Sequence, residues 1–424
     1  MHKVSKTTSK QAKSPFSRNF QREQKRQAIL SEAADLFNNQ GTRATTLSDI
    51  ATRLKLTKTT LYYYVKSKEE LIYLCYLASC DKLVEMLDSA ESHEGPGREK
   101  LAVFMRSNFQ VWKAVRLGQQ SHYAILTEIR ALREDHRQEV AERYSLLFKR
   151  VKSMIQVGIS DGSVVPCNEV DTALAIFGLV QLAVIWLPEI EADGFDQAAN
   201  QFIDLIFNGI AKQDEFVPGS FPGIPDAPAG FDRQAQNLKK QEAFYKTGSA
   251  FFNRKGFKGT SLDEIAEALD VTKGAFYYHI RDKEELVFHC FQRSLSIVNS
   301  MQDLAEIDAK SGLNELQLCA HYLFHIQNSD AGPLIRFNLI PSLSRKNKQT
   351  VMKGLKDVSD RFGRMIDKGI ADGSIRPVNP FITEQVLTAA VDISAELQWV
   401  RKFENLNDAY KSYFSFYFNG ISSE

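Results

Sequence analysis

Two short segments of the chain carry side chains suited to binding a polyanion. Thr57-Lys58 opens the first and Thr272-Lys273 opens the second, and a tyrosine follows four residues after each lysine. Lysine binds phosphate or guanine, small hydroxyl groups approach base edges, and a phenol hydroxyl donates to phosphate oxygen. These residue types predict contact with DNA. The sequence shows no glycine-rich phosphate loop, nucleophile elbow or metal signature of the kind that would predict an enzyme.

A capped helix precedes each segment. Thr46 is the expected N-cap of the first, and Ser261-Leu262-Asp263-Glu264 is a capping box for the second. A three-residue turn follows, and the contact segments themselves are expected to be short helices over 58–65 and 273–280. A helix, a tight turn and a second helix form the helix-turn-helix, whose second helix enters the major groove of DNA.

The second helix of each unit should bury its apolar residues and expose its polar ones. Leu61, Val65, Phe276 and Ile280 are expected in the core, and the tyrosines that follow Tyr62 and Tyr277, at 63 and 278, are interpreted as packing residues too. The side chains expected to contact DNA are Thr45, Thr46, Thr57, Lys58, Thr59, Thr60, Tyr62, Tyr64, Lys68, Thr260, Ser261, Thr272, Lys273, Gly274, Ala275, Tyr277, His279 and Lys283. An alternative is that one unit binds DNA and the other only packs.

Both units belong to a long internal repeat. Residues 26–71 align without a gap on 241–286, and 17 of these 46 positions are identical. A later block returns at an offset of 211, where 154–163 matches 365–374 and 207–210 matches 418–421. Two homologous halves are therefore fused head to tail.

The remaining pattern is helical and of ordinary globular composition. Apolar residues recur at helical spacing, no segment alternates as a strand would, and the fold class is all-α. The junction between the halves contains four prolines between 213 and 231, whose extended geometry would span about 60 Å. The apolar run from Ala173 to Leu187 is too short for a membrane span and is expected to be a buried helix.

Charge and cysteine content indicate a cytoplasmic protein that contacts a polyanion. The net charge is +1, but residues 1–26 carry eight basic side chains and one acid, a local +7 that leaves −6 for the rest. The alternative for this arm is a merely solvated tail. The five cysteines form no CxxC pair, as is common in a reducing compartment.

The combined pattern resembles a known family. Gly-x-x-x-Thr-[Thr/Ser]-Leu-x-[Asp/Glu]-Ile-Ala, then Thr-Lys-x-x-[Leu/Phe]-Tyr-Tyr and Lys-Glu-Glu-Leu, is similar to the N-terminal domain of the tetracycline-repressor (TetR) family, and it occurs twice. The resemblance implies a three-helix DNA-binding domain followed by a larger helical domain that binds an effector and dimerises. Lys55 and Asp270 depart from the glycine usual in the turn, and a left-handed lysine there costs on the order of 1 kcal/mol.

The resemblance gives a domain division and a mode of pairing. We expect a basic arm over 1–21, DNA-binding domains over 22–82 and 237–297, effector and dimerisation domains over 83–212 and 298–424, and a linker over 213–236. The two halves should form an intramolecular pseudo-dimer, with 170–187 and 202–210 against 382–400 and 410–421. Further oligomers could still form on DNA. Thr59-Thr60 against Gly274-Ala275, and Tyr64 against His279, predict half-sites of different sequence.

Polar and aromatic residues on apolar helices are the candidates for an effector pocket. They are Arg106, Phe109, Trp112, His122 and Tyr123 in the first half, and His321, Tyr322, His325, Arg336 and Asn338 in the second. The alternative for each aromatic residue is a core position. His321 and His325 could share a helix face as a metal pair, but no third ligand is fixed in sequence, so neither a metal nor a cofactor is predicted.

These observations favour a ligand-responsive DNA-binding regulator. The leading hypothesis is a cytoplasmic, nucleoid-associated repressor that a small-molecule effector releases from a double-stranded operator. The alternatives are an architectural or constitutive DNA-binding protein without a ligand, and an enzyme with a DNA-binding appendage. The sequence contains no catalytic signature that favours the last of these.

Overall fold

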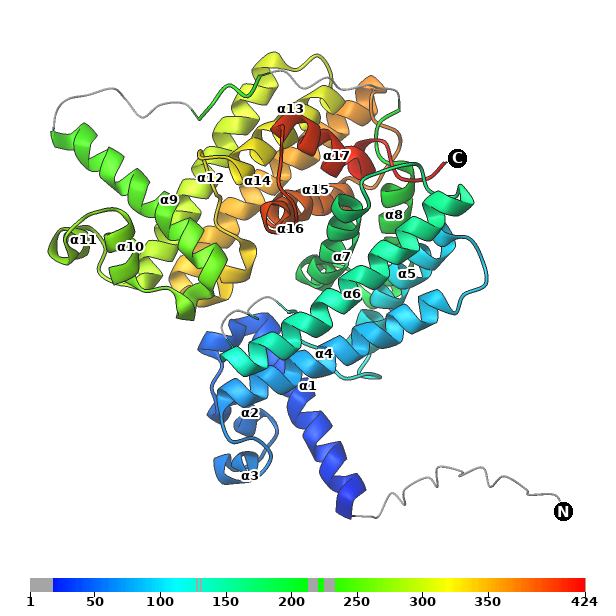
Figure 1. Ribbon diagram of the computed structural model, residues 1–424, viewed down its shortest axis with the longest axis vertical. Coiled ribbons are helices and arrows are strands. Elements are labelled where there is room, and N and C mark those ends of the chain that lie inside the picture. The colour runs from blue at the N-terminus through cyan, green and yellow to red at the C-terminus, as the bar shows by residue number, and fades with distance from the viewer. Residues whose placement is uncertain (1–17, 127–128, 130–131, 213–219, 225–232, 424) are drawn as a thin grey trace.

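The computed structural model describes residues 18–126, 129, 132–212, 220–224 and 233–423. Most of the basic arm and most of the linker lie outside these residues. Within them the protein is built from helices, with two isolated β-bridges between the halves. Figure 1 shows the two halves side by side, with each N-terminal unit projecting from a shared helical body.

The described residues of the first half form eight α-helices. They are α1 (Arg18–Ala44), α2 (Leu47–Arg53), α3 (Lys58–Tyr62), α4 (Lys68–Glu91), α5 (Gly97–Arg116), α6 (Glu134–Asp161), α7 (Glu169–Trp186) and α8 (Phe195–Asn208). Two short 3₁₀ segments, η2 (Leu187–Glu189) and η3 (Ala192–Gly194), connect the last two helices.

The second half repeats this order. Its helices are α9 (Arg233–Gly259), α10 (Leu262–Ala268), α11 (Lys273–His279), α12 (Lys283–Asp308), α13 (Gly312–Asn328), α14 (Arg345–Asp372), α15 (Pro380–Ser394), α16 (Leu397–Val400) and α17 (Leu406–Phe418), and the 3₁₀ segment η4 (Phe337–Ser342) precedes α14. The sequence repeat is thus a repeat of structure, as predicted.

Each N-terminal unit has a small apolar core of its own. In the first, Ile50, Leu61 and Leu71 bring α2, α3 and α4 together, and α1 packs across them. The last turn of α1 ends beyond Gly41, whose φ of 80° interrupts the helix, and Gly256 does the same in α9 with a φ of 69°. Glycine adopts this left-handed backbone without the strain of a Cβ.

The two larger helical regions share one hydrophobic core. Helices α7 and α8 of the first half pack against α15 and α17 of the second, in the segments expected from sequence to meet (Figure 1). The segment Glu169–Glu189 is long and apolar enough to cross a membrane, with a mean hydropathy of 2.0, but 78% of it is buried inside the protein. The expectation of a buried helix there is confirmed.

Contacts between the halves include reciprocal pairs. The Ala211 amide donates to the Phe418 carbonyl at 2.8 Å, and the equivalent Ser422 amide donates to the Phe207 carbonyl at 2.9 Å. The β-bridges are likewise related, since Val164 pairs with Ser422 and Ala211 with Ile375. Each of these contacts recurs between the two residues that lie 211 positions away in the sequence. Contacts that recur in this reciprocal way indicate an approximate two-fold axis.

One buried ion pair between the halves has no reciprocal. The Arg401 guanidinium donates twice to the Asp171 carboxylate at 2.6 Å, and the Ser412 hydroxyl donates to the same group. At the offset of 211, the equivalents of Asp171 and Arg401 are Ile382 and Ile190. The two halves therefore face each other with different chemistry at this point.

Candidate nucleic-acid interface

Helix α3 begins at a cap and is fixed by one buried residue. The Thr57 hydroxyl accepts from the Thr60 amide, and Leu61 is fully buried beneath the helix. Thr272 and Phe276 do the same for α11. The expected core positions, Val65 and Ile280 included, are confirmed. Helix α3 ends at Tyr62, three residues before its predicted end.

The preceding helices are capped as the sequence indicates. Ser261 and Glu264 form the predicted capping box at α10. Thr46 and Asp49 form a second one at α2, where the Thr46 amide donates to the Asp49 carboxylate at 2.7 Å. The hydrogen bonds from Thr46 lower the pKa of Asp49, so this cap stays ionised. Both helix-turn-helix units therefore start from the same kind of cap.

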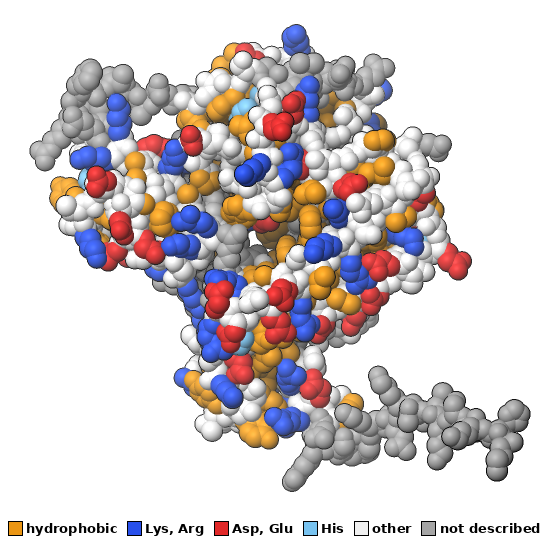
Figure 2. Space-filling model, in the orientation of Figure 1, with side chains coloured by type: hydrophobic (Ala, Val, Ile, Leu, Met, Phe, Trp, Pro, Cys, Tyr) orange, Lys and Arg blue, Asp and Glu red, His pale blue; other side chains and the backbone are white. Residues whose placement is uncertain are grey.

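The outer face of α3 and α11 carries most of the predicted contacts. Lys58, Thr59, Thr60 and Tyr62 are exposed on the first. On the second the exposed residues are Thr272, Lys273, Gly274, Ala275 and Tyr277, while Tyr64 and His279 are half-buried in their units. Figure 2 shows basic and hydrophobic side chains together at the tip of each N-terminal unit. Lysines beside exposed tyrosines form a surface that suits a phosphate backbone.

The interpretation of residues 63 and 278 as packing residues was wrong. Tyr63 is 68% exposed and Tyr278 83% exposed, more than any other tyrosine on these helices. Each follows a buried residue, Leu61 or Phe276, by two positions, and two positions on a helix lead to the opposite face. Arg22, at the start of α1, lies 5.4 Å from the centre of the Tyr63 ring. The start of α1 therefore lies beside the recognition helix.

Three of the predicted contacts point inward. The buried Thr45 hydroxyl donates to the Gly41 carbonyl at 2.9 Å, and Thr260 does the same to Gly256 at 2.8 Å. The Lys283 ammonium donates to the carbonyls of Phe257 and Thr260, both at 3.0 Å. These three side chains hold the turn before the helix-turn-helix.

The lysines of the two recognition helices have different neighbours. Lys273 donates to the Asp263 carboxylate at 2.6 Å, and the Tyr277 hydroxyl lies 3.4 Å from the same group. The hydrogen bond between Lys273 and Asp263 raises the pKa of the lysine and lowers that of the aspartate. The first unit has Ser48 at the position of Asp263, so the equivalent acid is absent from its sequence.

Each N-terminal unit is tied to its larger domain by an asparagine that the sequence interpretation missed. Asn38 donates to the Tyr123 carbonyl and accepts from the Ile125 amide. In the second half, Asn253 makes the same two bonds, to Leu334 and Arg336. Asn38 and Asn253 are identical across the repeat, and that identity outside the helix-turn-helix was the available signal.

A large cavity lies directly behind these ties. It has a volume of about 1000 Å³ and runs between α12, α14 and α15 of the second half and the ends of α1 and α7 of the first. Of the ten effector candidates, Trp112, His122 and Asn338 line it. The other seven candidates are not among the residues that line this cavity.

The remaining candidates fall into separate places. Phe109 lies in the core against Trp186 and Phe202, and Arg106 is bonded to Asn200 near the surface. Tyr123 accepts from Asn108 at 2.8 Å. His321 and His325 both contact the amide oxygen of Asn407, at 2.9 and 2.8 Å, and Tyr322 lies near Phe221.

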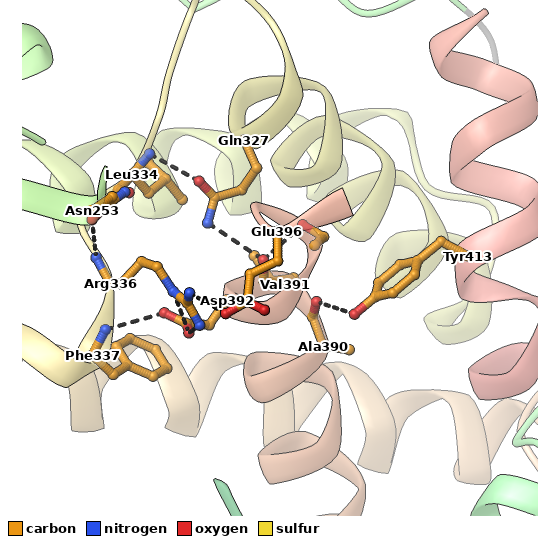
Figure 3. A network of polar contacts seen from close by, with 11 residues as sticks. Asn253, Gln327, Leu334, Arg336, Phe337, Ala390, Val391, Asp392, Glu396 and Tyr413 are labelled. Carbon is orange, nitrogen blue, oxygen red and sulfur yellow. Dashed lines mark hydrogen bonds and ion pairs between the residues drawn. The ribbon is translucent and has the colours of Figure 1, made fainter. Parts of the chain in front are cut away.

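Arg336 belongs to a buried ionic network on the edge of the cavity. Its guanidinium donates to Asp392 at 3.0 Å and also contacts Glu396, while the Phe337 amide donates to Asp392 at 3.1 Å (Figure 3). Burial lowers the pKa of Arg336, but the two carboxylates outweigh it and keep the group charged. Because the Arg336 amide also donates to Asn253, this network joins α9 to α15.

Two capped helix pairs with exposed lysine and tyrosine residues define a helix-turn-helix DNA-binding protein. Residues 29–73 and 245–290 both match the profile described as "Bacterial regulatory proteins, tetR family", and residues 94–210 match "Tetracyclin repressor-like, C-terminal domain". The chain belongs to the tetR family and carries its DNA-binding domain twice. It is a transcriptional regulator.

Similar curated proteins each match less than half of this chain. The Transposon Tn10 TetC protein of Escherichia coli is 22% identical over 158 residues, which is 37% of this chain and 79% of that protein. YerO of Bacillus subtilis, an uncharacterized HTH-type transcriptional regulator, is 27% identical over 40% of this chain and 64% of its own length. The transcriptional regulator AcrR of Shigella flexneri is 35% identical over 18% of this chain and 35% of its own length.

Two similar solved structures each cover less than half of this chain. The TetR family regulator PfmR from Thermus thermophilus is 24% identical, covers 42% of this chain and 95% of its own, and has a TM-score of 0.34. AibR in complex with isovaleryl coenzyme A and operator DNA is 22% identical, covers 42% of this chain and 96% of its own, and has a TM-score of 0.36.

Proposed function

We propose that this protein is a repressor that acts in the cytoplasm on the nucleoid and leaves its operator when a small molecule binds. The observation that carries this proposal is the cavity of about 1000 Å³, because its wall includes Asn38 and the segment that receives Asn253. A ligand in that space would press on the contacts that fix both DNA-binding units. Cavities of this size hold drug-sized or metabolite-sized ligands.

We further propose that one chain presents both recognition helices as a pseudo-dimer. The reciprocal bonds of Ala211 and Ser422 support this arrangement, because a two-fold axis relates identical patches in a dimer. Family members with one helix-turn-helix need two chains to reach two major grooves one helical turn apart. We keep the domain division expected from sequence, with DNA-binding domains over 22–82 and 237–297.

Release requires that the effector bind the DNA-bound state and the released state with different affinities. A ligand shifts an equilibrium only by the difference between its affinities for those states. In the DNA-bound state the two units must sit at the spacing of the operator. We propose that a ligand in the cavity changes the angle of α1 and α9 relative to the larger helical domains. Asn38 and Asn253, which bond these helices to those domains, would transmit the change.

The operator should be read asymmetrically. Thr59 and Thr60 present hydroxyl and methyl groups to the bases, whereas Gly274 and Ala275 at the same positions present almost no side chain. The half-site under the second unit is therefore expected to tolerate more sequences. Tyr64 and His279 add a second difference.

Selection of bound fragments from the source genome with the full chain tests this function. We expect sites with two unlike half-sites about one DNA turn apart, bound by one chain in sedimentation. Palindromic sites, or an obligate two-chain particle off DNA, would contradict the asymmetric pseudo-dimer. Thermal shifts with a metabolite panel, followed by DNA binding with each hit, test effector release, and a panel without any effect on DNA affinity supports constitutive binding instead.

A further inference from the structure

The face between the halves, formed within residues 164–211 of the first and 375–422 of the second, is crossed by two ion pairs. Arg401 donates to Asp171, whose side chain is fully buried. The Arg376 guanidinium lies 2.6 Å from the Asp204 carboxylate and also donates to the Gly209 carbonyl at 2.6 Å. Both pairs take the acid from the first half and the base from the second. The two sides of the face therefore carry opposite charges, although the halves share one fold.

The second ion pair has no reciprocal across the two-fold axis, as the first has none. The backbone amides of Arg376 and Val165 each donate to a carbonyl of the opposite half at 3.0 Å, and these two hydrogen bonds are equivalent at the offset of 211. Val165 therefore stands where the other side of the axis has Arg376, and its side chain carries no charge. Asp204 is likewise replaced by Ser415. The charge difference thus extends over two separate positions of the face.

Packing across the face is unequal as well. Gly178 of α7 lies against Ile393 of α15, and a Cβ on this glycine would come within 2.7, 2.9 and 3.1 Å of three carbon atoms of the isoleucine. A β-branched side chain has few alternative rotamers, so it has little freedom to move aside. At the offset of 211 the equivalent residues are Ala389 and Leu182. The isoleucine therefore fits against glycine, and an alanine in its place would clash.

A pair of two first halves would leave its acids without bases. Asp171 would face Ile190, which is the equivalent of Arg401. Asp204 would face Val165. A buried carboxylate that loses its partner is strongly destabilising, because the cost of removing it from water is no longer offset. The charges of the face therefore oppose this pair.

A pair of two second halves would be opposed by both charge and packing. Its arginines would meet Ile382 and Ser415 in place of the two aspartates. Ala389 would also bring its Cβ to the position beside Ile393 that is open at Gly178. Closely packed interiors do not absorb an added carbon without strain. A first half against a second half satisfies charge and packing together.

We infer that the face between the halves selects its partner, so that a first half pairs with a second half and neither pairs with a copy of itself. The inference rests on the proposed pseudo-dimer and specifies what each half accepts. The partner of the first half is a surface that carries Arg376 and Arg401 opposite its two aspartates. Two chains that meet through these faces must therefore exchange halves.

Charge reversal in two intact chains tests the inference. A basic variant carries Asp171→Arg with Asp204→Arg, and an acidic variant carries Arg376→Asp with Arg401→Asp, each with its own affinity tag. Each variant alone opposes like charges between its own halves. In a mixture, exchange of halves restores every pair of opposite charges. We expect the co-expressed variants to co-purify as a particle of one chain of each kind in sedimentation, with at least tenfold more of the second chain than in the controls.

Matched controls separate partner selection from other effects of charge. All four substitutions in one chain reverse both pairs and should give a one-chain particle. The basic variant should not co-purify with the wild type, because exchange would create as many like-charge contacts as it removes. Asp81→Arg and Arg143→Asp, in separate chains, reverse an exposed ion pair inside the first half. Exchange of halves does not repair that pair, so these two chains should not co-purify either.

The packing contribution is tested in the intact chain by urea unfolding. Gly178→Ala copies the second half and should lower the urea midpoint, and the added Ile393→Leu, which copies Leu182, should recover at least half of the loss. Gly363→Ala in α14 is the control, because a Cβ there meets nothing within 4 Å and the midpoint should not fall. An unchanged midpoint in Gly178→Ala would overturn the packing part of the inference.

The co-purification decides the charge part. Basic and acidic variants that remain separate folded chains, or controls that co-purify equally well, would overturn it. If either variant alone is unfolded by circular dichroism, folded protein on co-expression supports exchange, and unfolded protein beside a folded four-substitution chain contradicts it. If the four-substitution chain does not fold, reversal of the partly exposed Asp204–Arg376 pair alone takes its place in the same comparison.

The same measurements keep this result distinct from the proposed function. A wild type that sediments as one chain, together with variants that do not co-purify, leaves the pseudo-dimer standing and removes partner selection. A wild type that sediments as two chains contradicts the pseudo-dimer, and co-purification of the two variants then still establishes partner selection. Neither outcome depends on whether a small molecule releases the operator.

Discussion

At the scale of single residues, the recognition helices are chemically unequal. Both expose tyrosine, but Lys273 is held by an acid in the free protein, and Lys58 has no acid at the equivalent position. The first unit has Lys58 near the Tyr62 ring, 6.0 Å from its centre, and Arg22 beside the next tyrosine. In the proposed complex with DNA, the second unit must therefore break the ion pair of Lys273 with Asp263, whereas Lys58 has no equivalent pair to break.

Removing the tyrosine hydroxyls tests whether both units engage DNA. Tyr62→Phe and Tyr277→Phe should each weaken operator binding about three- to tenfold, because each loses a hydrogen bond to a charged phosphate while its ring stays in place. Anisotropy titrations at fixed salt measure this. If one of the two variants leaves the operator affinity unchanged, the unit that carries this substitution packs without binding DNA.

Removing the acid beside Lys273 should strengthen DNA binding. Asp263→Asn takes away a negative charge and frees the ammonium for phosphate, so we expect affinity to rise several-fold and the salt slope to steepen by about one. Titrations at several salt concentrations measure both. Asp193→Asn, in η3, makes the same change in net charge and should leave the slope unaltered. Equal effects of the two variants would show that only overall charge matters.

At the scale of elements, each helix-turn-helix is set by its caps and by one strained turn residue. Lys55 has a φ of 55° and Asp270 a φ of 53°, so both lie in the left-handed region where the family usually has glycine. Aspartate tolerates that region better than lysine. The departure from the family pattern noted in the sequence is therefore a real conformational cost, larger in the first unit.

Relieving that strain should stabilise the first unit. Lys55→Gly is expected to raise the free energy of unfolding by about 0.5–1 kcal/mol, the strain relieved minus the added freedom of the unfolded chain. Thermal or urea unfolding measures it. Lys55→Ala removes the charge without relieving the backbone and should give no gain, and an equal gain in both variants would rule out backbone strain as the cause.

Much of each element was predictable, because local signals decide it. Caps at Thr46, Thr57 and Ser261 and the apolar spacing around Ile50 and Leu61 depend on residues within a few positions of one another. The inward turn of Thr45 and Lys283 was not predictable, because Thr45 binds the carbonyl of Gly41 and Lys283 binds that of Phe257, and both carbonyls are placed by the glycine that interrupts the preceding helix.

The cavity was beyond reach of the sequence for a different reason. Its wall joins helices from both halves, and periodicity indicates which residues are inside without saying which inside residues meet empty space.

At the scale of the whole molecule, the crossing of α8 and α17 fixes one half to the other. A Cβ on Gly209 would lie 2.3 Å from the Phe418 carbonyl oxygen, and one on Gly420 would lie 2.1 Å from that of Phe207. Both glycines also have positive φ. These two close approaches between the halves are again reciprocal, and no larger residue fits either.

Substituting these glycines should loosen the whole body. Gly209→Ala and Gly420→Ala are each expected to cost about 2–4 kcal/mol, the sum of a steric clash and left-handed strain. Gly162→Ala shares the positive φ but meets nothing within 4 Å, so it should cost only about 1 kcal/mol. Urea unfolding compares the three. Equal losses would show that φ alone matters and that the crossing is not tightly packed.

The reciprocal crossing of two halves within one chain also has a consequence for dosage. A repressor assembled from two separate chains loses its active form with the square of its concentration once it is diluted below its dimerisation constant. In the pseudo-dimer proposed here, the partner is always tethered at high effective concentration, so active repressor falls only in proportion to dilution. A twofold dilution of the protein would then halve the concentration of the active form rather than quarter it.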